Sequence, residues 1–408
     1  MKRAASAAGV LLSTLALFSL LARVQPFDWA SAFLDRAFHA APKWTSVENL
    51  YRDPETQEIS RGDHPLASFA VLAKHWEAHP GVPRAVFIGN SQMLTLTLGP
   101  GEAPDREPGK TFVDLIADRG RQDGKFLAYR LSAGGMSYEE ALWYVYYLLT
   151  VPEIKPDAIL VQINYQFFAQ YGVRDGMLEL LKDRRFLDKI EQAAGAGMPY
   201  SQIFAVSLAR FRSLVERATS VATGGGESDA SHAAPSTSGS LAGKLENAVR
   251  DRLQSLPELN GSIAGKKSFL EMLYRFRLYI FRVAPSSARS ISGPRLLQSR
   301  SCLEAMAQIC RDDHVRLMLF HAPLNPDVTL YGTPQDKQGH YAFVRDLAAR
   351  YQIPVGEFEE AIPSQYWGKI LNGPEVLHMG RAGQKMLADM LLDMMAKNAG
   401  GKWTYAVQ

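Results

Sequence analysis

The feature that most constrains the fold of this chain is a short apolar run that ends in a small, polar turn containing a serine. Residues 82–88 have the composition of a buried β-strand, and Gly89-Asn90-Ser91 follows them directly. In open α/β folds, ligands bind at the carboxyl ends of the strands. The run therefore predicts a strand that presents the Ser91 hydroxyl at the ligand-binding edge of a sheet, although Gly-Asn-Ser is also ordinary turn chemistry.

Four further runs have strand character, and helical segments lie between most of them. The strand-like runs are residues 126–132, 158–163, 315–320 and 353–358, and the helical segments include 138–149, 301–311 and 335–351. Strands that alternate with helices are typical of an α/β fold with a parallel sheet. The sequence therefore predicts a central parallel sheet of about five strands.

Composition limits the class of protein. At 408 residues, with 47% hydrophobic and 21% charged residues, the chain is long enough to bury a large globular core. A net charge of +3 is too small for a dedicated nucleic-acid binder. The only cysteines, Cys302 and Cys310, exclude a disulfide framework and a cysteine zinc site. On one helix they would lie roughly 12 Å apart, so we expect two core thiols.

The extreme N-terminus has the pattern of a membrane-targeting segment. Lys2 and Arg3 precede an uncharged, largely apolar run over residues 4–22. About 20 such residues span a bilayer, and the flanking charges favour a cytoplasmic N-terminus. We expect residues 1–24 to be a single-pass anchor in the inner (cytoplasmic) membrane, with the rest of the chain in the periplasm. A cleaved signal peptide is the alternative, but Leu21-Ala22-Arg23-Val24 is a poor cleavage site.

The remaining chain divides by composition. Residues 25–80 show no clear period and are interpreted as a stalk and lead-in, followed by the sheet domain at 81–400. An insertion at 175–300 interrupts that domain, and its Gly/Ser-rich part at about 222–244 is predicted to be a disordered linker. Residues 266–300 are basic and aromatic, which fits either a surface for anionic partners or a partly buried helix with snorkelling arginines.

Polar residues follow two more of the predicted strands. Ala133-Gly134-Gly135 comes after the second strand, and Asn164 after the third. Glycine N–H groups and an asparagine amide can donate hydrogen bonds to a developing oxyanion. The alternatives are a simple tight turn at Gly134 and Gly135 and ordinary capping by Asn164.

Two histidines are candidates for a general base. His321 ends the fourth predicted strand, but the proline-rich loop after it supplies no nearby carboxylate. His378 follows Glu375 by three residues, just before a helical segment that begins near Arg381. We favour His378 as the base with Glu375 as its orienting carboxylate, and interpret His321 as a residue that lines the cleft or is satisfied structurally.

These four features, in this order, resemble the SGNH/GDSL hydrolase family. The resemblance covers roughly residues 80–175 and 300–397 and implies a three-layer, flavodoxin-like sandwich. It also implies a Ser91, His378 and Glu375 triad, with an oxyanion hole from the Ser91 N–H, Gly134 or Gly135, and Asn164. No cofactor and no metal are implied.

The chain departs from the family pattern at four positions. Asn90, Tyr165 and Glu375 stand where the family has aspartate, and Gln162 stands where it has glycine. Asn90 is a further possible cleft residue.

The anchor narrows the resemblance to an extracytoplasmic branch, the alginate O-acetylation proteins and the D-alanine-transfer protein of teichoic acid synthesis, which work beside a membrane-bound O-acyltransferase. This implies a membrane-anchored esterase or O-acyltransferase that acts on ester-linked acyl groups of a cell-surface polysaccharide. Its partners would be an acyl donor, a polysaccharide acceptor and such an acyltransferase, with no nucleic acid. A non-catalytic protein that binds glycan or partners the acyltransferase is the alternative.

Overall fold

The computed structural model describes residues 45–48, 65–98, 109–170, 172–197, 200–222, 291, 293–328, 333–370 and 373–398. The predicted anchor at 1–24 lies outside these ranges, as do the predicted linker from residue 223 onward and the basic aromatic segment up to residue 290. Among the helices of the described ranges, none has both the length and the apolar composition needed to cross a bilayer.

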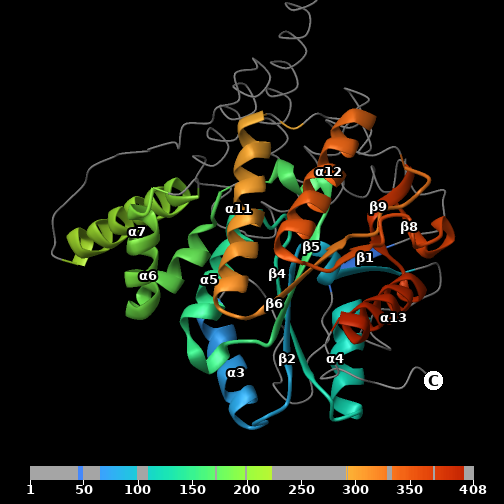
Figure 1. Cartoon of the computed structure of the whole chain (residues 1–408), viewed down its shortest axis with the longest axis horizontal. Helices are drawn as coiled ribbons and strands as arrows, with labels where there is room; N and C mark the ends of the chain where they lie inside the picture. The colour runs from blue at the N-terminus through green and yellow to red at the C-terminus, as the bar shows by residue number, and fades with distance from the viewer. Residues whose placement is uncertain are drawn as a thin grey trace, which may run out of the picture.

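Five parallel strands form the central sheet of the described structure (Figure 1). In spatial order they are β4 (Leu127–Ser132), β2 (Arg84–Gly89), β5 (Ala158–Ile163), β6 (Arg316–His321) and β7 (Val355–Glu357). Every neighbouring pair is parallel. The predicted α/β fold and its five-stranded parallel sheet are therefore confirmed. The order, with the first of these strands between the second and third, is the flavodoxin-like one.

Helices cover both faces of the sheet (Figure 1). One face packs against α3 (Pro65–Glu77), α5 (Tyr138–Thr150), α11 (Gly293–Asp312) and α12 (Pro334–Tyr351). The other packs against α4 (Phe112–Gln122) and α13 (Arg381–Asn398). Alternate residues of β2 are buried on opposite faces of the sheet. Val86 and Ile88 belong to the first core, and Ala85 and Phe87 belong to the second. Burial on both faces explains why the strands are continuous apolar runs.

The packed domain extends N-terminal to residue 81, into the segment interpreted as a lead-in. Residues 65–77 form α3, in which Phe69, Leu72 and Trp76 are buried. Their spacing of three and four residues places them on one side of a helix. Further upstream, β1 (Thr45–Glu48) pairs antiparallel with β3 (Thr95–Leu98), the strand that follows the serine turn.

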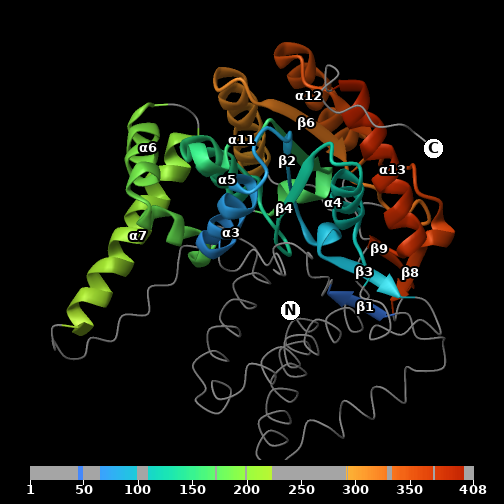
Figure 2. The same ribbon diagram turned by 90° about the horizontal axis from the view of Figure 1, so that it is seen from below.

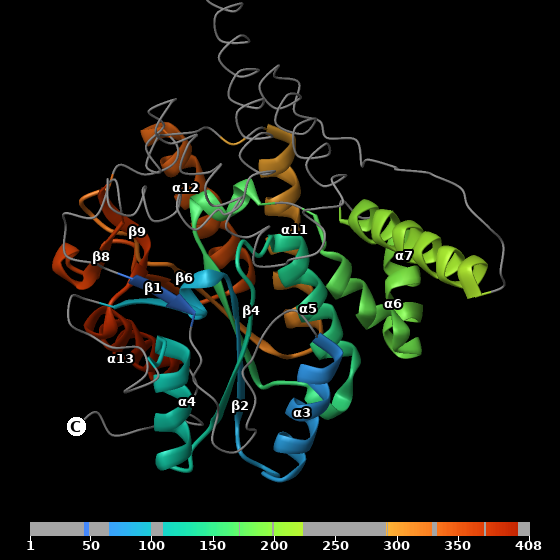
Figure 3. The ribbon, with the colours of Figure 1, turned by 180° about the vertical axis from the view of Figure 1, so that it is seen from behind.

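The first part of the predicted insertion packs against α5. It contains η4 (Asp175–Lys182), α6 (Arg184–Gly195) and α7 (Ser201–Ala222), and α6 and α7 project from one side of the molecule (Figure 3). Phe186 and Phe204 contact Trp143 with ring centroids 5.4 and 6.2 Å apart. The start of the insertion is thus part of the main core.

A second antiparallel pair carries the candidate base. The strands β8 (Trp367–Ile370) and β9 (Gly373–Met379) pair with each other, and β9 contacts β3. The strands β1, β3, β8 and β9 lie together beside α13 (Figure 2). His378 therefore lies in a strand, whereas the sequence suggested only a position just before a helix.

Candidate active site

The serine turn begins where β2 ends. Asn90 precedes a single 3-10 turn, η1 (Ser91–Met93), and its side-chain Oδ1 accepts a hydrogen bond from the Gln92 N–H at 3.1 Å. This cap gives Asn90 a structural role in the turn, and its side chain is 4% exposed. Since β2 lies between β4 and β5, the Ser91 hydroxyl emerges at the switch point where flavodoxin-like sheets bind ligands.

The structure brings Ser91 and His378 together from positions 287 residues apart. Ser91 Oγ lies 3.1 Å from His378 Nε2, within hydrogen-bond distance, and both side chains are part-buried. A nucleophile hydroxyl bonded to an imidazole is the central contact of serine acyl transfer. Glu375 lies in β9 three residues before His378, but its side chain is outside the described part of the structure.

Backbone contacts fix the strand that carries His378. The carbonyl of Leu377 accepts a hydrogen bond from Gln92 Nε2 at 2.7 Å, and the carbonyl of His378 accepts one from Thr97 Oγ1 at 3.0 Å. Gln92 belongs to the serine turn and Thr97 to β3. The base is therefore anchored to the same segment that carries the nucleophile.

The candidate oxyanion donors flank β2 on both sides. Gly134 and Gly135 form an exposed turn after β4, and Asn164 follows β5 with 1% of its surface exposed. Gly135 has a φ of 65°, in the left-handed region that favours glycine, so the turn alone accounts for its identity. The Asn164 N–H donates to Tyr138 Oη at 3.1 Å, which ties this strand end to the start of α5.

Two buried glutamines near the site were missed as functional residues. Gln162 is 2% exposed and Gln92 is fully buried. Gln162 Oε1 accepts a hydrogen bond from the Asn90 N–H at 3.0 Å, and its Nε2 donates to Gln92 Oε1. A Cβ at Gly89 would lie 2.4 Å from Gln162 Oε1, so this glutamine occupies the space above a glycine. The available sequence signal was the departure at Gln162, because a buried amide requires partners.

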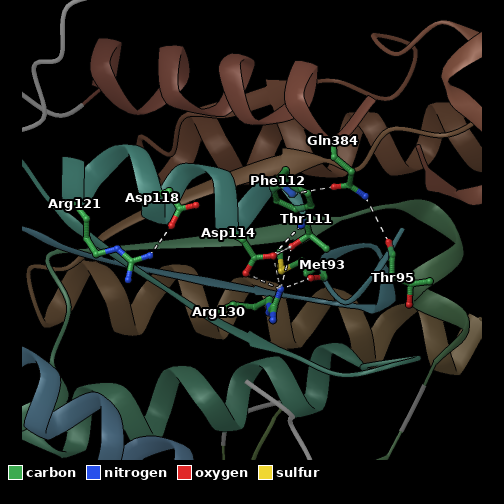
Figure 4. A network of polar contacts seen from close by, with 9 residues as sticks. All are labelled: Met93, Thr95, Thr111, Phe112, Asp114, Asp118, Arg121, Arg130 and Gln384. Carbon is green, nitrogen blue, oxygen red and sulfur yellow. Dashed lines mark hydrogen bonds and ion pairs between the residues drawn. The ribbon is translucent and has the colours of Figure 1, made fainter. Parts of the chain in front are cut away.

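A buried ion pair supports the far end of the serine turn (Figure 4). Arg130, in β4, is 5% exposed, and its Nη1 donates to the Met93 carbonyl at 2.6 Å. The same nitrogen lies 3.3 Å from Asp114 Oδ1 and donates to Thr111 Oγ1 at 3.0 Å. The sequence does not single out Arg130, because its partners lie in two other segments, the serine turn and the start of α4.

A separate contact in the same region joins two helices. Gln384, on α13, accepts a hydrogen bond from the Phe112 N–H of α4 at 2.9 Å (Figure 4).

His321, the rival base, packs away from solvent. Its ring lies 5.3 Å from that of His340 and 4.9 Å from that of Tyr341, and it is 2% exposed. Burial lowers the pKa of His321, while the carboxylates of Glu359 and Glu357 act in the opposite direction. The hydroxyl of Ser91 contacts His378 instead. Among the described residues, no group of three or more His, Cys, Asp or Glu side chains is arranged to hold a metal ion.

No protein-family model matches the sequence, and no curated protein matches it significantly. Solved structures that align with this chain include the psychrotrophic esterase EstA from Pseudoalteromonas sp., with 9% identity, a TM-score of 0.36 and coverage of 77% of this chain and 97% of that one. A lipase/acylhydrolase from Enterococcus faecalis has 11% identity and a TM-score of 0.35, covering 78% of this chain and 96% of that one. The acetylxylan esterase Axe2 from Geobacillus stearothermophilus has 9% identity and a TM-score of 0.33, covering 79% and 97%. Similarity at this level does not transfer an activity or a substrate to this chain.

Proposed function

We propose that this chain is a serine-dependent esterase or O-acyltransferase, with Ser91 as nucleophile and His378 as general base. The contact of 3.1 Å between Ser91 Oγ and His378 Nε2 carries the proposal. It lies at the carboxyl end of a parallel sheet, where such folds bind ligands. Both side chains are part-buried, so the pair is shielded yet retains access to solvent.

The reaction has two balanced steps. In the first, His378 Nε2 takes the Ser91 proton as Oγ attacks an ester carbonyl carbon, and the tetrahedral intermediate then expels the alcohol, which takes the proton from the imidazolium. In the second, a water or sugar hydroxyl loses its proton to His378 as it attacks the acyl-enzyme carbonyl carbon, and the intermediate then expels Ser91 Oγ, which takes the proton back from the imidazolium. The first acceptor gives hydrolysis and the second gives transfer.

The intermediate needs donors for its oxyanion. We assign that role to the Ser91 N–H, a backbone N–H of Gly134 or Gly135, and the Asn164 amide, since these residues follow β2 and its two neighbouring strands. Loss of one such donor costs roughly two to three powers of ten in rate. Glu375 is assigned as the carboxylate that orients His378, on the sequence resemblance alone.

The proposed substrate is an ester-linked acyl group of a cell-surface polysaccharide. The apolar N-terminal segment has the pattern of a membrane anchor with a cytoplasmic N-terminus. This pattern supports an active site outside the cytoplasm. In this setting the acyl donor would come from a membrane-bound O-acyltransferase. Release of acyl groups from an acetylated polysaccharide, with and without added sugar acceptor, distinguishes hydrolysis from transfer.

Labelling by a serine-directed fluorophosphonate tests the nucleophile. The full chain, extracted in detergent, should gain the phosphonyl mass on the peptide that contains Ser91, and Ser91→Ala should abolish the label. His378→Gln should slow labelling at least about 10³-fold, since loss of a triad member removes most of the catalysis. Ser213→Ala, at an exposed position of α7, is the matched control and should label normally. Absence of label at Ser91 in the unchanged chain would refute the catalytic proposal and favour the non-catalytic alternative.

A further inference from the structure

We propose that Gln92 and Gln162 are positioning residues that keep Ser91 and His378 within hydrogen-bond distance of each other. This inference rests on the proposed function. Their side chains form one chain of amides, which begins at the Asn90 N–H and ends at two backbone carbonyls, those of Pro323 and Leu377. Both glutamines are buried, so each polar atom in the chain depends on its partner inside the protein.

Backbone groups at both ends fix the direction of this chain. Gln92 Nε2 faces the carbonyl oxygens of Pro323 and Leu377, each at 2.7 Å, and only the amide nitrogen can donate to them. Gln92 Oε1 must then accept from Gln162 Nε2. That leaves Gln162 Oε1 to accept from the Asn90 N–H at 3.0 Å. A flip of either amide would set like groups against each other, so the two side chains have one arrangement.

The chain of amides links the segments that carry the reacting atoms. Gln162 holds the residue before Ser91, and Gln92 is the residue after it. The Leu377 carbonyl belongs to the residue before His378. Breaking the chain at Gln92 therefore removes the hydrogen bond that joins the backbone of β9 to the serine turn. A displacement of about 1 Å between reacting groups can reduce a rate about a hundredfold, even when the substitution does not touch the substrate.

A neutral amide is required at position 92. A carboxylate of the same shape would direct oxygen at both carbonyls and would also lose the two donated hydrogen bonds. In a variant without the Gln92 amide, β9 loses the hydrogen bond at the Leu377 carbonyl, but Thr97 still donates to the His378 carbonyl. Gln92→Met removes the amide while preserving the length of the side chain, and Gln162→Met breaks the chain at the Asn90 end.

Gln384→Met is the matched control. Gln384 is a fully buried glutamine that bonds a backbone N–H of α4, and no described hydrogen bond joins it to the Ser91 turn residues 90–93 or to His378. Its loss should lower the melting temperature by an amount similar to that of the other two variants. Labelling at Ser91 should then remain within about twofold of the unchanged chain, since reacting groups that keep their geometry keep their rate.

The experiment measures fluorophosphonate labelling of Ser91, and kcat and KM for p-nitrophenyl acetate, in the full chain and its variants below their melting temperatures. We expect Gln92→Met to lower kcat about a hundredfold with KM nearly unchanged. The double variant with Gln162→Met should fall little further, because both residues act through one chain. If Gln92→Met does not fold, the same measurements on Gln162→Met test the proposal. That variant leaves both carbonyl contacts of Gln92 in place and breaks only the Asn90 end of the chain.

The outcomes separate the two proposals. If the unchanged chain does not label, the proposed function fails. If the unchanged chain labels and the glutamine variants label at the same rate despite lower melting temperatures, only the positioning role is overturned. Equal slowing by Gln384→Met would also overturn it, because the effect would then be general destabilisation.

Discussion

His340 should make this protein sensitive to acid. The side chain lies on α12, is 1% exposed and is surrounded by the rings of His321, Phe168 and Tyr341 at 5.3, 5.0 and 5.7 Å. Among the described residues, neither of its ring nitrogens has a hydrogen-bond partner. Burial lowers the pKa of His340 from 6.5 to about 3, and the charges of His321 and Arg300 add to the effect.

The direction and size of the effect follow from this pKa. The unfolded chain binds a proton at this histidine below pH 6.5, whereas the folded chain does so only below about pH 3. Stability is therefore complete above pH 6.5 and is lost as the pH falls towards the pKa of the folded state. The slope is about 1.4 kcal/mol per pH unit, so acidification by two units below 6.5 costs about 3 kcal/mol.

Urea unfolding of the full chain at pH 7 and pH 4.5 measures this contribution. His340→Phe keeps a ring of similar shape and removes the titrating group, so the variant should lose about 3 kcal/mol less than the unchanged chain between the two pH values. His314→Asn is the control, because His314 is exposed and asparagine tolerates its φ of 55°. Equal losses in the unchanged chain and His340→Phe would refute the reasoning.

Three further predictions concern the surroundings of the site. Arg130→Met leaves the buried Asp114 without its ion pair and should lower the free energy of unfolding by about 3–5 kcal/mol, part of which Arg130→Met with Asp114→Asn should restore, measured in urea. Burial raises the pKa of Glu139 from 4.5 to about 7, so stability falls as the pH rises through that interval. Glu139→Gln should remove this loss of up to about 3 kcal/mol, which unfolding at pH 5 and pH 8 would show. Gly89→Ala places a Cβ 2.4 Å from Gln162 Oε1 and should lower stability by about 1–3 kcal/mol in the same assay, and a smaller effect would mean that Gln162 moves freely.

The central sheet was predictable because its strands are buried on both faces. Each of the five sheet strands lies within two residues of an apolar run in the sequence. The strands β1, β3, β8 and β9 were not predicted. Two of them, β1 and β3, pair across a long stretch of chain, and no local pattern specifies such a partner. The helix α3 was missed, although its buried Phe69, Leu72 and Trp76 recur at the spacing of three and four residues that is typical of a helix.

The candidate site was predictable only in part, for a related reason. Ser91 follows a strand directly and His378 follows a carboxylate by three residues, so both stand out in the sequence. Gln92, Gln162 and Arg130 do not, because their significance depends on partners elsewhere in the fold. Gln92 reaches Leu377, which is 285 residues away, and Arg130 reaches Met93 on a neighbouring segment. A buried polar side chain is recognised only once its partners are known.

The location of His378 in β9 changes how the base is held. A histidine in a loop before a helix would depend mainly on a carboxylate to fix its position, but a strand residue is also held by its own backbone. Here the Thr97 hydroxyl donates a hydrogen bond to the His378 carbonyl, and the Gln92 amide donates one to the Leu377 carbonyl. Because Gln92 is in the serine turn and Thr97 is in the strand after it, a shift of that segment carries both reacting side chains with it. The separation of Ser91 Oγ and His378 Nε2 is thus protected by contacts that lie outside the Glu-x-x-His pattern, and it need not depend on the carboxylate of Glu375 alone.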